Sequence, residues 1–371
     1  MDMDCGIAVI GAGVVGLATA AALSQRERSI FILEKNGSHG MGVSSRNSEV
    51  VHAGIYYPPG SLKAKLCVEG RERLYAICAR QGLPHRKLGK LIVALSEQEC
   101  GKLQQLRETA EENGVPGLSL VGEKGLRDLE PNVRAVAGLH SPETGIISAH
   151  HLMGHFLHVA KECGAEIVCG TSVIGIEEVR RGFRITTEDE RGERFAFVSE
   201  RVVNAAGLYA DGIAAMVGAQ YAQHYCKGDY FSVQNVPGNT VRRLVYPLPE
   251  ANHVGLGVHV TLDLSGRMRL GPDATYMEKR EDYRVDVGKR DAFFESAVRF
   301  LPFLKKENIV ADMSGIRPKL QGPGEGFRDF VISEDRPGFV NLVGIESPGL
   351  TAAPAIARQV AETLTTARAA A

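Results

Sequence analysis

The chain has 371 residues, of which 44% are hydrophobic, and a formal net charge of −1. This length suits two domains, and the apolar content supports a sizeable core. The balanced charge, with no basic run interleaved with aromatic residues, argues against nucleic acid as a main partner. The seven cysteines are scattered and never spaced as CxxC, which indicates thiols in a reducing compartment.

The first predicted elements are a strand, a glycine turn, a helix and a second strand. An apolar run at 7–10 leads into GAGVVG at 11–16, and the apolar run at 30–33 is followed directly by Glu34. This order is the dinucleotide-binding fingerprint in its structural context. The sequence therefore predicts a bound adenine dinucleotide; the alternative is a glycine turn that serves only packing.

Each part of the fingerprint has a physical role. Gly11 permits a tight turn, Gly13 lets the backbone approach a pyrophosphate, and Gly16 lets helix and strand pack closely. The helix N-terminus offers unpaired N–H groups to phosphate. Glu34 can accept hydrogen bonds from both ribose hydroxyls and would repel a 2′-phosphate.

The apolar residues 6–23 could also be interpreted as a signal peptide. However, the leader Met-Asp-Met-Asp is acidic, and the three glycines of the turn interrupt the apolar stretch. Cleavage would remove the cofactor site. We therefore expect a folded unit in a cytoplasmic protein with no integral membrane segment. A peripheral position at the inner membrane is the alternative, although no lipid-seeking helix is evident.

A long polar, glycine-rich loop is predicted over 36–59. The elements expected after it are helices over 61–81, 97–113 and 149–163, strands over 89–95, 166–169, 173–178, 183–187 and 194–198, a strand from 201 into NAAG at 204–207, short strands over 225–233, 241–246, 255–261, 268–270 and 330–332, a strand over 338–343, and a helix over 351–367.

Strands of the dinucleotide-binding type thus recur in three separated regions, with strand-rich segments between them. We predict an α/β protein: a Rossmann-like FAD-binding domain built from separated segments, with an inserted α+β substrate domain that carries an antiparallel sheet. The expected FAD-binding segments are 1–80, 145–220 and 310–371, and the expected substrate-binding segments are 81–144 and 221–309.

Three features favour FAD over NAD. The fingerprint lies at the start of the chain, a second small-residue turn follows a strand at 204–207, and a third, GIESPGLT at 344–351, opens a helix. Backbone N–H groups at that helix start could bind the pyrimidine end of a flavin. No second strand-linked GxGxxG is present for a nicotinamide.

Several further motifs are specific enough to compare with known families: SSRNSEVVHAGIYY at 44–57, SLKAKLC at 61–67, GKLIVA at 89–94, KGDY at 227–230, LGVHVT at 256–261 and LGPDA at 270–274. In these motifs the chain resembles the FAD-dependent D-amino-acid-oxidase-like superfamily, which includes glycerol-3-phosphate dehydrogenase and glycine oxidase. Within it, the resemblance is closest to the L-2-hydroxyglutarate dehydrogenase/oxidase family. Departures follow Tyr276: the stretch to about 306 looks short for that family, and GIRPK at 315–319 looks more like the amino-acid oxidases.

The resemblance implies FAD-dependent oxidation of a small 2-hydroxy acid, L-2-hydroxyglutarate to 2-oxoglutarate, by hydride transfer to flavin N5. The expected partners are this small-molecule substrate and oxygen or quinone as electron acceptor. The nearest alternative is an amino-acid or glycine oxidase, which would oxidise an amine and need hold only one carboxylate. A non-catalytic NAD-binding module is a further alternative from a different class.

His52 and His259 are the candidate bases, since imidazole has a suitable proton affinity near neutral pH. By resemblance, the loop with His52 runs beside the pyrophosphate toward the flavin, so His52 could instead contact or covalently link the flavin. His259 shares a strand face with Gly257 and Thr261, and the alternative is a histidine satisfied within the sheet.

Arg317 is the candidate clamp for the substrate carboxylate, because its guanidinium fork can donate two hydrogen bonds. A surface ion pair is the alternative. A dicarboxylate needs a second cation, for which Lys63, Lys65 and Lys227 are candidates, although each could be a solvated charge. Tyr246 and Tyr56 are weaker candidates for substrate contact.

The serine-rich loop at 44–48 offers hydrogen-bond donors to phosphate, with Arg46 to offset its charge. Val173 is included on the resemblance alone. The residues expected to bind the cofactor are Gly11, Gly13, Val14, Val15, Gly16, Glu34, Lys35, Ser44, Ser45, Arg46, Asn47, Ser48, His52, Val173, Ala206, Gly207, Gly344, Ser347, Pro348, Gly349, Leu350 and Thr351.

His151, His155 and His158 lie on one predicted helix face, a spacing that can bind zinc. No HExxH glutamate accompanies them, and the family implied by the resemblance uses no metal. We therefore expect a solvated or packed histidine face and no metal site.

Overall fold

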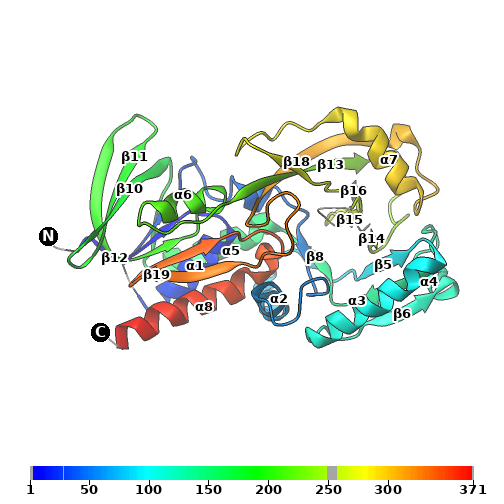
Figure 1. The fold of residues 1–371 in the computed structure, drawn as a ribbon, viewed down its shortest axis with the longest axis horizontal. Coiled ribbons are helices and arrows are strands. Elements are labelled where there is room, and N and C mark those ends of the chain that lie inside the picture. Colours follow the sequence, from blue (N-terminus) through cyan, green and yellow to red (C-terminus); the bar gives the residue numbers. More distant parts are fainter. Residues whose placement is uncertain (1–2, 28, 249–256, 370–371) are drawn as a thin grey trace. The chain divides into compact units, whose positions relative to one another are not determined.

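The computed structural model describes residues 3–27, 29–248 and 257–369, and the chain divides into two compact units (Figure 1). Each unit is assembled from segments that are far apart in the sequence, which confirms the expected fold class. Unit 1 comprises Met1–Ser45, Ala149–His224 and Pro318–Ala371, and unit 2 comprises Arg46–Ser148 and Tyr225–Arg317.

The expected domain boundaries differ most at residues 46–80, which belong to unit 2 and not to the unit with the fingerprint. The smaller differences, at 145–148, 221–224 and 310–317, lie close to the crossing points. The reason is long-range pairing. Val50 and Val51 pair with a strand near residue 146, and the Arg71 guanidinium donates to the Ala53 carbonyl oxygen at 3.2 Å.

Unit 1 contains a sheet whose central strands are all parallel. Figure 1 shows the long β10–β11 hairpin (green) beside β12. In chain order its elements are β1 (Cys5–Ile10), α1 (Val14–Ser24), β2 (Ile30–Leu33), η1 (Val43–Ser45), α5 (Ala149–Glu162), β9 (Glu166–Val168), β10 (Thr171–Val179), β11 (Gly182–Asp189), β12 (Arg194–Asn204), η3 (Gly207–Tyr209), α6 (Ala210–Ala215), β19 (Val331–Arg336), β20 (Phe339–Val343) and α8 (Gly349–Ala369).

The parallel strands of unit 1 run in the order β20–β12–β1–β2–β9. Their register aligns Ile10 with Leu33 on one side and with Asn204 on the other, and Asn204 with Asn341. The carboxyl ends of β1, β2, β12 and β20 therefore end at one edge of the sheet, where ligands bind in open α/β folds.

Close packing at the first turn depends on glycine. A Cβ atom built on Gly16 would lie 2.0 Å from the Gly11 carbonyl oxygen, and one on Gly11 would lie 2.5 Å from the Ala205 carbonyl oxygen. Gly11 also has a φ of 103°, in the region that disfavours side chains. Helix α1 then packs against α5 and α8. The predicted reasons for Gly11 and Gly16 agree with this geometry.

Unit 2 contains a larger mixed sheet and a three-stranded one. Its elements are β3 (Val50–Val51), α2 (Leu62–Gln81), β4 (His85–Arg86), β5 (Lys90–Ala94), η2 (Glu97–Glu99), α3 (Cys100–Glu112), β6 (Ser119–Gly122), α4 (Glu123–Leu129), β7 (Ala137–Ser141), β8 (Gly145–Ile147), β13 (His224–Val233), β14 (Leu244–Pro247), β15 (Val260–Leu262), β16 (Met268–Leu270), β17 (Thr275–Met277), η4 (Val287–Lys289), α7 (Arg290–Val298), η5 (Lys306–Asn308) and β18 (Ile309–Lys319).

The larger sheet runs in the order β17–β13–β16–β15–β14–β5–β7–β6, and β18 pairs with β13. Most neighbours are antiparallel, and β5 pairs in parallel with β14 and antiparallel with β7. All five residues of β5 are buried. Figure 1 shows α3 and α4 beside β6 and β5 (cyan), and both helices contact β7. Strand β5 therefore lies in the interior of unit 2.

Both ends of helix α2 follow from local sequence. The Ser61 hydroxyl accepts a hydrogen bond from the Ala64 N–H at 3.2 Å, which satisfies one of the free donors at the helix start. Gly82 ends the helix in the left-handed conformation, with a φ of 65°. The predicted helix over 61–81 is confirmed.

Some predicted elements differ from the structure. Residues 255 and 256 of the strand expected over 255–261 lie outside the described residues, and β15 begins only at Val260. The strands expected over 194–198 and from 201 form the single strand β12. Helices α4 and α7 were not expected, because their short apolar patterns lie in polar sequence.

None of the helices in the described ranges combines the length and apolarity needed to cross a bilayer.

We predict that Gly16→Ala destabilises the protein by about 1–3 kcal/mol or more, because the added methyl group overlaps the Gly11 carbonyl oxygen. The matched control is Gly154→Ala in helix α5, where a Cβ meets no other atom within 4 Å. This control should be neutral or stabilising by up to about 1 kcal/mol. Urea unfolding of both variants measures the difference; equal stabilities would contradict the packing argument.

Candidate active site

The glycine turn of unit 1 forms a backbone cradle at the start of α1. Gly13 precedes the helix in an extended conformation, and the Val14 N–H donates to the Ser44 hydroxyl at 2.9 Å. A Cβ on Gly13 would lie 2.9 Å from the same hydroxyl oxygen. The first turn of α1 contains no acidic residue that would compete with an anion.

Glu34 is held beside this cradle and is 7% exposed. Its carboxylate accepts hydrogen bonds from the Ala12 N–H at 2.9 Å, from the Asn36 N–H at 3.0 Å and from the Asn36 side-chain amide at 2.7 Å. A carboxylate has about four acceptor positions, so capacity remains for a ribose hydroxyl. The adjacent Lys35 donates to the Tyr209 hydroxyl at 3.1 Å.

The second and third turns are joined by one side chain. The Gln223 amide donates to the Gly207 carbonyl oxygen at 3.1 Å, and its oxygen accepts from the Gly344 N–H at 3.0 Å. Gly344 has a φ of 70°, and helix α8 begins at Gly349. Near the start of this helix, Lys319 forms a buried ion pair with the Glu346 carboxylate, at 3.4 Å.

The remaining cofactor candidates of unit 1 have different positions. Val173 lies in β10 and packs, as Phe31 and Ala206 do, against the hydrophobic core of unit 1. Thr351 is buried in the first turn of α8, and Ser45 is exposed. The three turns, the missing Cβ atoms and the Glu34 carboxylate together fit the phosphates and ribose of an adenine dinucleotide.

Unit 2 brings together most of the other candidates and one residue that was not anticipated. The ring of Tyr246, in β14, stacks on that of His259 with centroids 3.8 Å apart. The Lys90 ammonium of β5 lies 3.8 Å from the centroid of the Tyr246 ring and 5.2 Å from that of Tyr56. His52 is close enough for Lys90 and His259 both to affect its pKa.

Both histidines are held in the neutral form. Burial lowers the pKa of His259 to about 3, and the charges of Lys90 and Arg317 add to this effect. Burial, reinforced by Lys90 and His259, likewise holds the pKa of His52 well below its usual value. The Gly257 carbonyl oxygen can only accept a hydrogen bond, so His259 donates from Nδ1 at 2.9 Å and Nε2 keeps its lone pair. Both rings can therefore accept a proton.

Lys90 is 1% exposed, and desolvation lowers the pKa of its ammonium to about 7. The strand alternation explains its position: Lys90 pairs with Leu244 across the β5–β14 ladder, which makes Tyr246 a diagonal neighbour on the same face. Sequence reasoning used GKLIVA only as a family match. A usable signal was present, namely a lysine that opens a five-residue run of buried strand.

Arg317, in β18, is half-buried. Its positive charge lowers the pKa of His259 and opposes the rise that burial causes at Tyr246 and Tyr230. The Tyr230 hydroxyl lies 2.9 Å from that of Ser48. Unit 2 thus combines two imidazoles, two cations and several phenols, a set suited to an anion that loses a proton.

The other candidates of the serine-rich loop have local partners. The guanidinium of Arg46 lies 4.1 Å from the centroid of the Tyr283 ring, and Asn47 accepts from the Glu49 N–H at 2.7 Å. The expected role of Arg46 and Asn47 in binding phosphate therefore stays a prediction.

The three lysines that the sequence suggested as a second cation have other surroundings. Lys63 is buried and Lys65 exposed, both in the first turns of α2. Lys227 donates to the Arg284 carbonyl oxygen and lies 3.8 Å from the Asp229 carboxylate. Its charge therefore has local protein partners. The lysine that the fold brings to the histidines is Lys90.

The described ranges contain no group of three or more His, Cys, Asp or Glu side chains arranged to hold a metal. On α5, His151 and His158 are exposed and His155 is half-buried. The His151 ring instead contacts that of His150 edge-on, at 6.0 Å between centroids.

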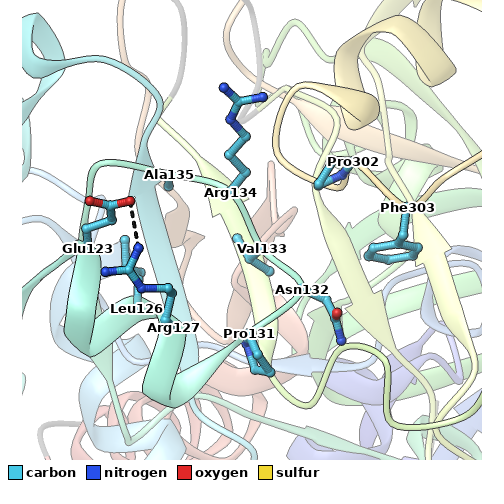
Figure 2. A pocket seen from close by; sticks show the side chains of 10 residues that line it. All are labelled: Glu123, Leu126, Arg127, Pro131, Asn132, Val133, Arg134, Ala135, Pro302 and Phe303. Atoms are coloured by element: carbon cyan, nitrogen blue, oxygen red, sulfur yellow. Dashed lines mark hydrogen bonds and ion pairs between the residues drawn. The ribbon is translucent and has the colours of Figure 1, made fainter.

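A pocket of about 340 Å³ lies elsewhere on unit 2 (Figure 2). The dashed line in Figure 2 marks the exposed ion pair between Glu123 and Arg127, at 2.9 Å. None of the clustered histidines, tyrosines or cations lines it, so it is not the candidate active site. Its lining residues are Glu123, Leu126, Arg127, Pro131, Asn132, Val133, Arg134, Ala135, Pro302 and Phe303.

A parallel sheet with three such turns at one edge defines a dinucleotide-binding protein. The sequence profile of the DAO family, described as FAD dependent oxidoreductase, matches residues 6–363, so the chain belongs to this family. It is an FAD-dependent oxidoreductase, as the sequence predicted.

The chain is 40% identical to a protein named mitochondrial L-2-hydroxyglutarate dehydrogenase of Arabidopsis thaliana, over 95% of this chain and 82% of that one. It is 32% identical to the Escherichia coli L-2-hydroxyglutarate dehydrogenase, over 92% and 78%. Among solved structures, L-alpha-glycerophosphate oxidase from Mycoplasma pneumoniae with FAD bound has a TM-score of 0.88 at 28% identity, covering 98% of this chain and 95% of that one.

We predict that Lys90→Met stabilises the protein near pH 7, and that this gain shrinks as the pH rises toward 10. The folded pKa of Lys90 is about 7 against 10.5 for an exposed lysine, so between these values the unfolded chain binds a proton that the folded one does not. That difference amounts to a few kcal/mol at pH 7.

Urea unfolding of both proteins between pH 7 and 9 checks this expectation. The control is Lys102→Met in α3. Lys102 is exposed, so this substitution also removes a lysine charge, but not a buried one. A stability difference for Lys90→Met that does not change with pH would contradict the expectation.

Proposed function

We propose that this enzyme oxidises L-2-hydroxyglutarate to 2-oxoglutarate. Two relatives of known name, one from a plant and one from a bacterium, are L-2-hydroxyglutarate dehydrogenases. The observation that carries the proposal is the buried cluster of two neutral imidazoles with two cations, Lys90 and Arg317. A dianionic hydroxy acid that must lose a proton matches this chemistry.

The reaction removes two electrons and two protons from the substrate, as a hydride from C2 and a proton from the hydroxyl group. When bound, FAD supplies the hydride acceptor at N5. The protein must bind the acid, hold C2 in one orientation and accept the hydroxyl proton in a site with little water.

We propose His52 and His259 as the groups that accept this proton. Each is neutral before the substrate binds, and the negative charge of the bound acid would raise both pKa values toward the working pH. The ring of His259 is oriented by the Gly257 carbonyl and by stacking on Tyr246, which supports a fixed position for its Nε2.

Arg317 is proposed to bind the carboxylate next to the reacting carbon. A guanidinium remains charged and can donate two parallel hydrogen bonds, so it fixes the plane of the carboxylate as well as its position. The Tyr246 and Tyr56 hydroxyls are proposed as further donors, because burial raises the pKa of both phenols and keeps them protonated.

The FAD is proposed to lie along the three turns of unit 1, with its pyrophosphate at Gly13 to Gly16 and its ribose at Glu34. The residues proposed to hold it are those that the sequence suggested around the first turn, around 44–48, and at 206–207 and 344–351, with His52 and Val173. Oxygen or quinone as electron acceptor, and a cytoplasmic location, stay predictions; one relative is named as mitochondrial.

We expect anaerobic mixing with L-2-hydroxyglutarate to bleach the flavin absorbance of the purified enzyme. D-2-hydroxyglutarate, glycine, L-amino acids and glycerol 3-phosphate, mixed in the same way, should leave it oxidised. Bleaching by an amino acid and not by the hydroxy acid would favour the amino-acid oxidase alternative, and bleaching by glycerol 3-phosphate alone would contradict both.

We predict that replacing the base, by His52→Gln or His259→Gln, slows flavin reduction by about 10² to 10⁴-fold while FAD stays bound. Stopped-flow absorbance gives the rate, and the flavin-to-protein ratio reports occupancy. His140→Gln in β7 is a control outside the cluster. If neither cluster variant slows reduction by at least about tenfold, the imidazole base is excluded.

A further inference from the structure

Lys90 is a charged residue in a place where apolar residues are the rule. It opens strand β5, whose other members, Leu91 to Ala94, are all fully buried. The strand is paired on both sides, with β14 and with β7, so Lys90 lies in an interior strand of the sheet and not at its edge. A leucine or methionine would fill the same volume without desolvating a charge.

The ammonium of Lys90 has aromatic neighbours instead of an acidic one. Its Nζ lies over the Tyr246 ring, and no carboxylate in the described ranges lies within ion-pair distance. Cation–π contact offsets only part of the desolvation of a buried ammonium. A buried cation without an anionic partner among the described residues is suited to an anion from a ligand.

Lys90 and Arg317 both act on His259, one of the two proposed bases. Both positive charges lower the pKa of His259, so a proton-accepting imidazole lies near both cations. A five-carbon dicarboxylate with its hydroxyl on C2 has two anionic ends. The hydroxyl that must lose its proton lies next to one of these ends.

We propose that Lys90 binds the distal carboxylate of a dicarboxylic 2-hydroxy acid, while Arg317 binds the carboxylate next to C2, so that Lys90 selects dicarboxylates over monocarboxylates. This inference rests on the proposed function, which supplies the substrate class. The rings of Tyr56 and Tyr246 lie beside the ammonium, and their hydroxyls are proposed to donate further hydrogen bonds to the bound acid.

The pH range in which Lys90 can be observed alone follows from its neighbours. The groups facing it are Cys67 from α2, His52 and Tyr56 from the segment before α2, Tyr246 from β14, and His259 before β15. Burial keeps the histidines neutral, raises the pKa of Cys67 to about 12 and keeps both phenols protonated. Between pH 7 and 9, only Lys90 among them changes its charge.

The first test compares two substrates on the FAD-loaded enzyme: L-2-hydroxyglutarate, and L-2-hydroxypentanoate, which has a methyl group in place of the distal carboxylate. For Lys90→Met, kcat/KM of flavin reduction should fall roughly 10- to 100-fold more with the dicarboxylate than with the monocarboxylate. Lys90→Arg, which keeps the charge, should recover part of the discrimination.

Other outcomes overturn the proposal. An equal loss with both substrates would mean that Lys90 acts on the shared end of the acid, as a base or by positioning the histidines. No loss with either substrate would mean that its ammonium is structural. Far-UV circular dichroism and flavin content of the variants exclude misfolding as the cause of a loss.

The second test requires no turnover. Glutarate, which has both carboxylates and no hydroxyl to oxidise, is titrated into the oxidised enzyme, and its binding is followed by the flavin absorbance. Its Kd should rise about tenfold per pH unit above pH 7 for the wild type, because the protonated fraction of Lys90 falls at that rate, and should depend less steeply on pH for Lys90→Met. A pH-independent Kd for the wild type would overturn the proposal.

The two tests also separate this proposal from the function on which it rests. If the wild type binds glutarate through Lys90 but L-2-hydroxyglutarate leaves the flavin oxidised, the dicarboxylate subsite stands and the proposed reaction is wrong. If L-2-hydroxyglutarate reduces the flavin and Lys90→Met retains the discrimination, the reaction stands and the assignment of Lys90 is wrong.

Discussion

The parallel register of β1, β2, β12 and β20 is the constraint on which the cofactor site depends. Because Ile10, Leu33, Asn204 and Asn341 lie level across the sheet, the turns that follow these strands gather at one edge although they come from three parts of the chain. Gln223 then joins two of the turns through hydrogen bonds to Gly207 and Gly344. The close approach of helix and strand at Gly16 requires the absence of a side chain there.

In unit 2 the corresponding constraint is desolvation. Burial acts on every titratable member of the cluster in the direction that removes charge: it holds His52 and His259 neutral, keeps the phenols protonated, and lowers the pKa of Lys90 to about 7. The result is a set of proton acceptors and donors in which a bound dianion would raise the pKa of the bases and of the lysine. Substrate binding and preparation for proton transfer thus have the same physical origin.

Lysine and arginine are not equivalent in this arrangement. Arg317 stays charged at any accessible pH and can fix a carboxylate plane with two hydrogen bonds. Lys90 carries a compact ammonium whose charge depends on its surroundings, so its affinity for an anion varies with pH where that of Arg317 does not. A site with one arginine and one lysine can hold one carboxylate of a substrate rigidly and bind the other end only where that end carries a negative charge.

The sequence alone determined the cofactor class and the first turn, because the fingerprint is local: three closely spaced glycines, two apolar runs and Glu34 specify a strand, turn and helix without help from distant residues. It also indicated His52 and His259, which lie in family motifs, Arg317 through the match of a guanidinium to a carboxylate, and Tyr246 as a weaker candidate for substrate contact. It misassigned residues 46–80, since pairing of Val50 and Val51 with β8 is a long-range contact. Only the tertiary structure showed Lys90 as the buried cation beside the histidines, because that position depends on the register of β5 against β14, which no local pattern encodes.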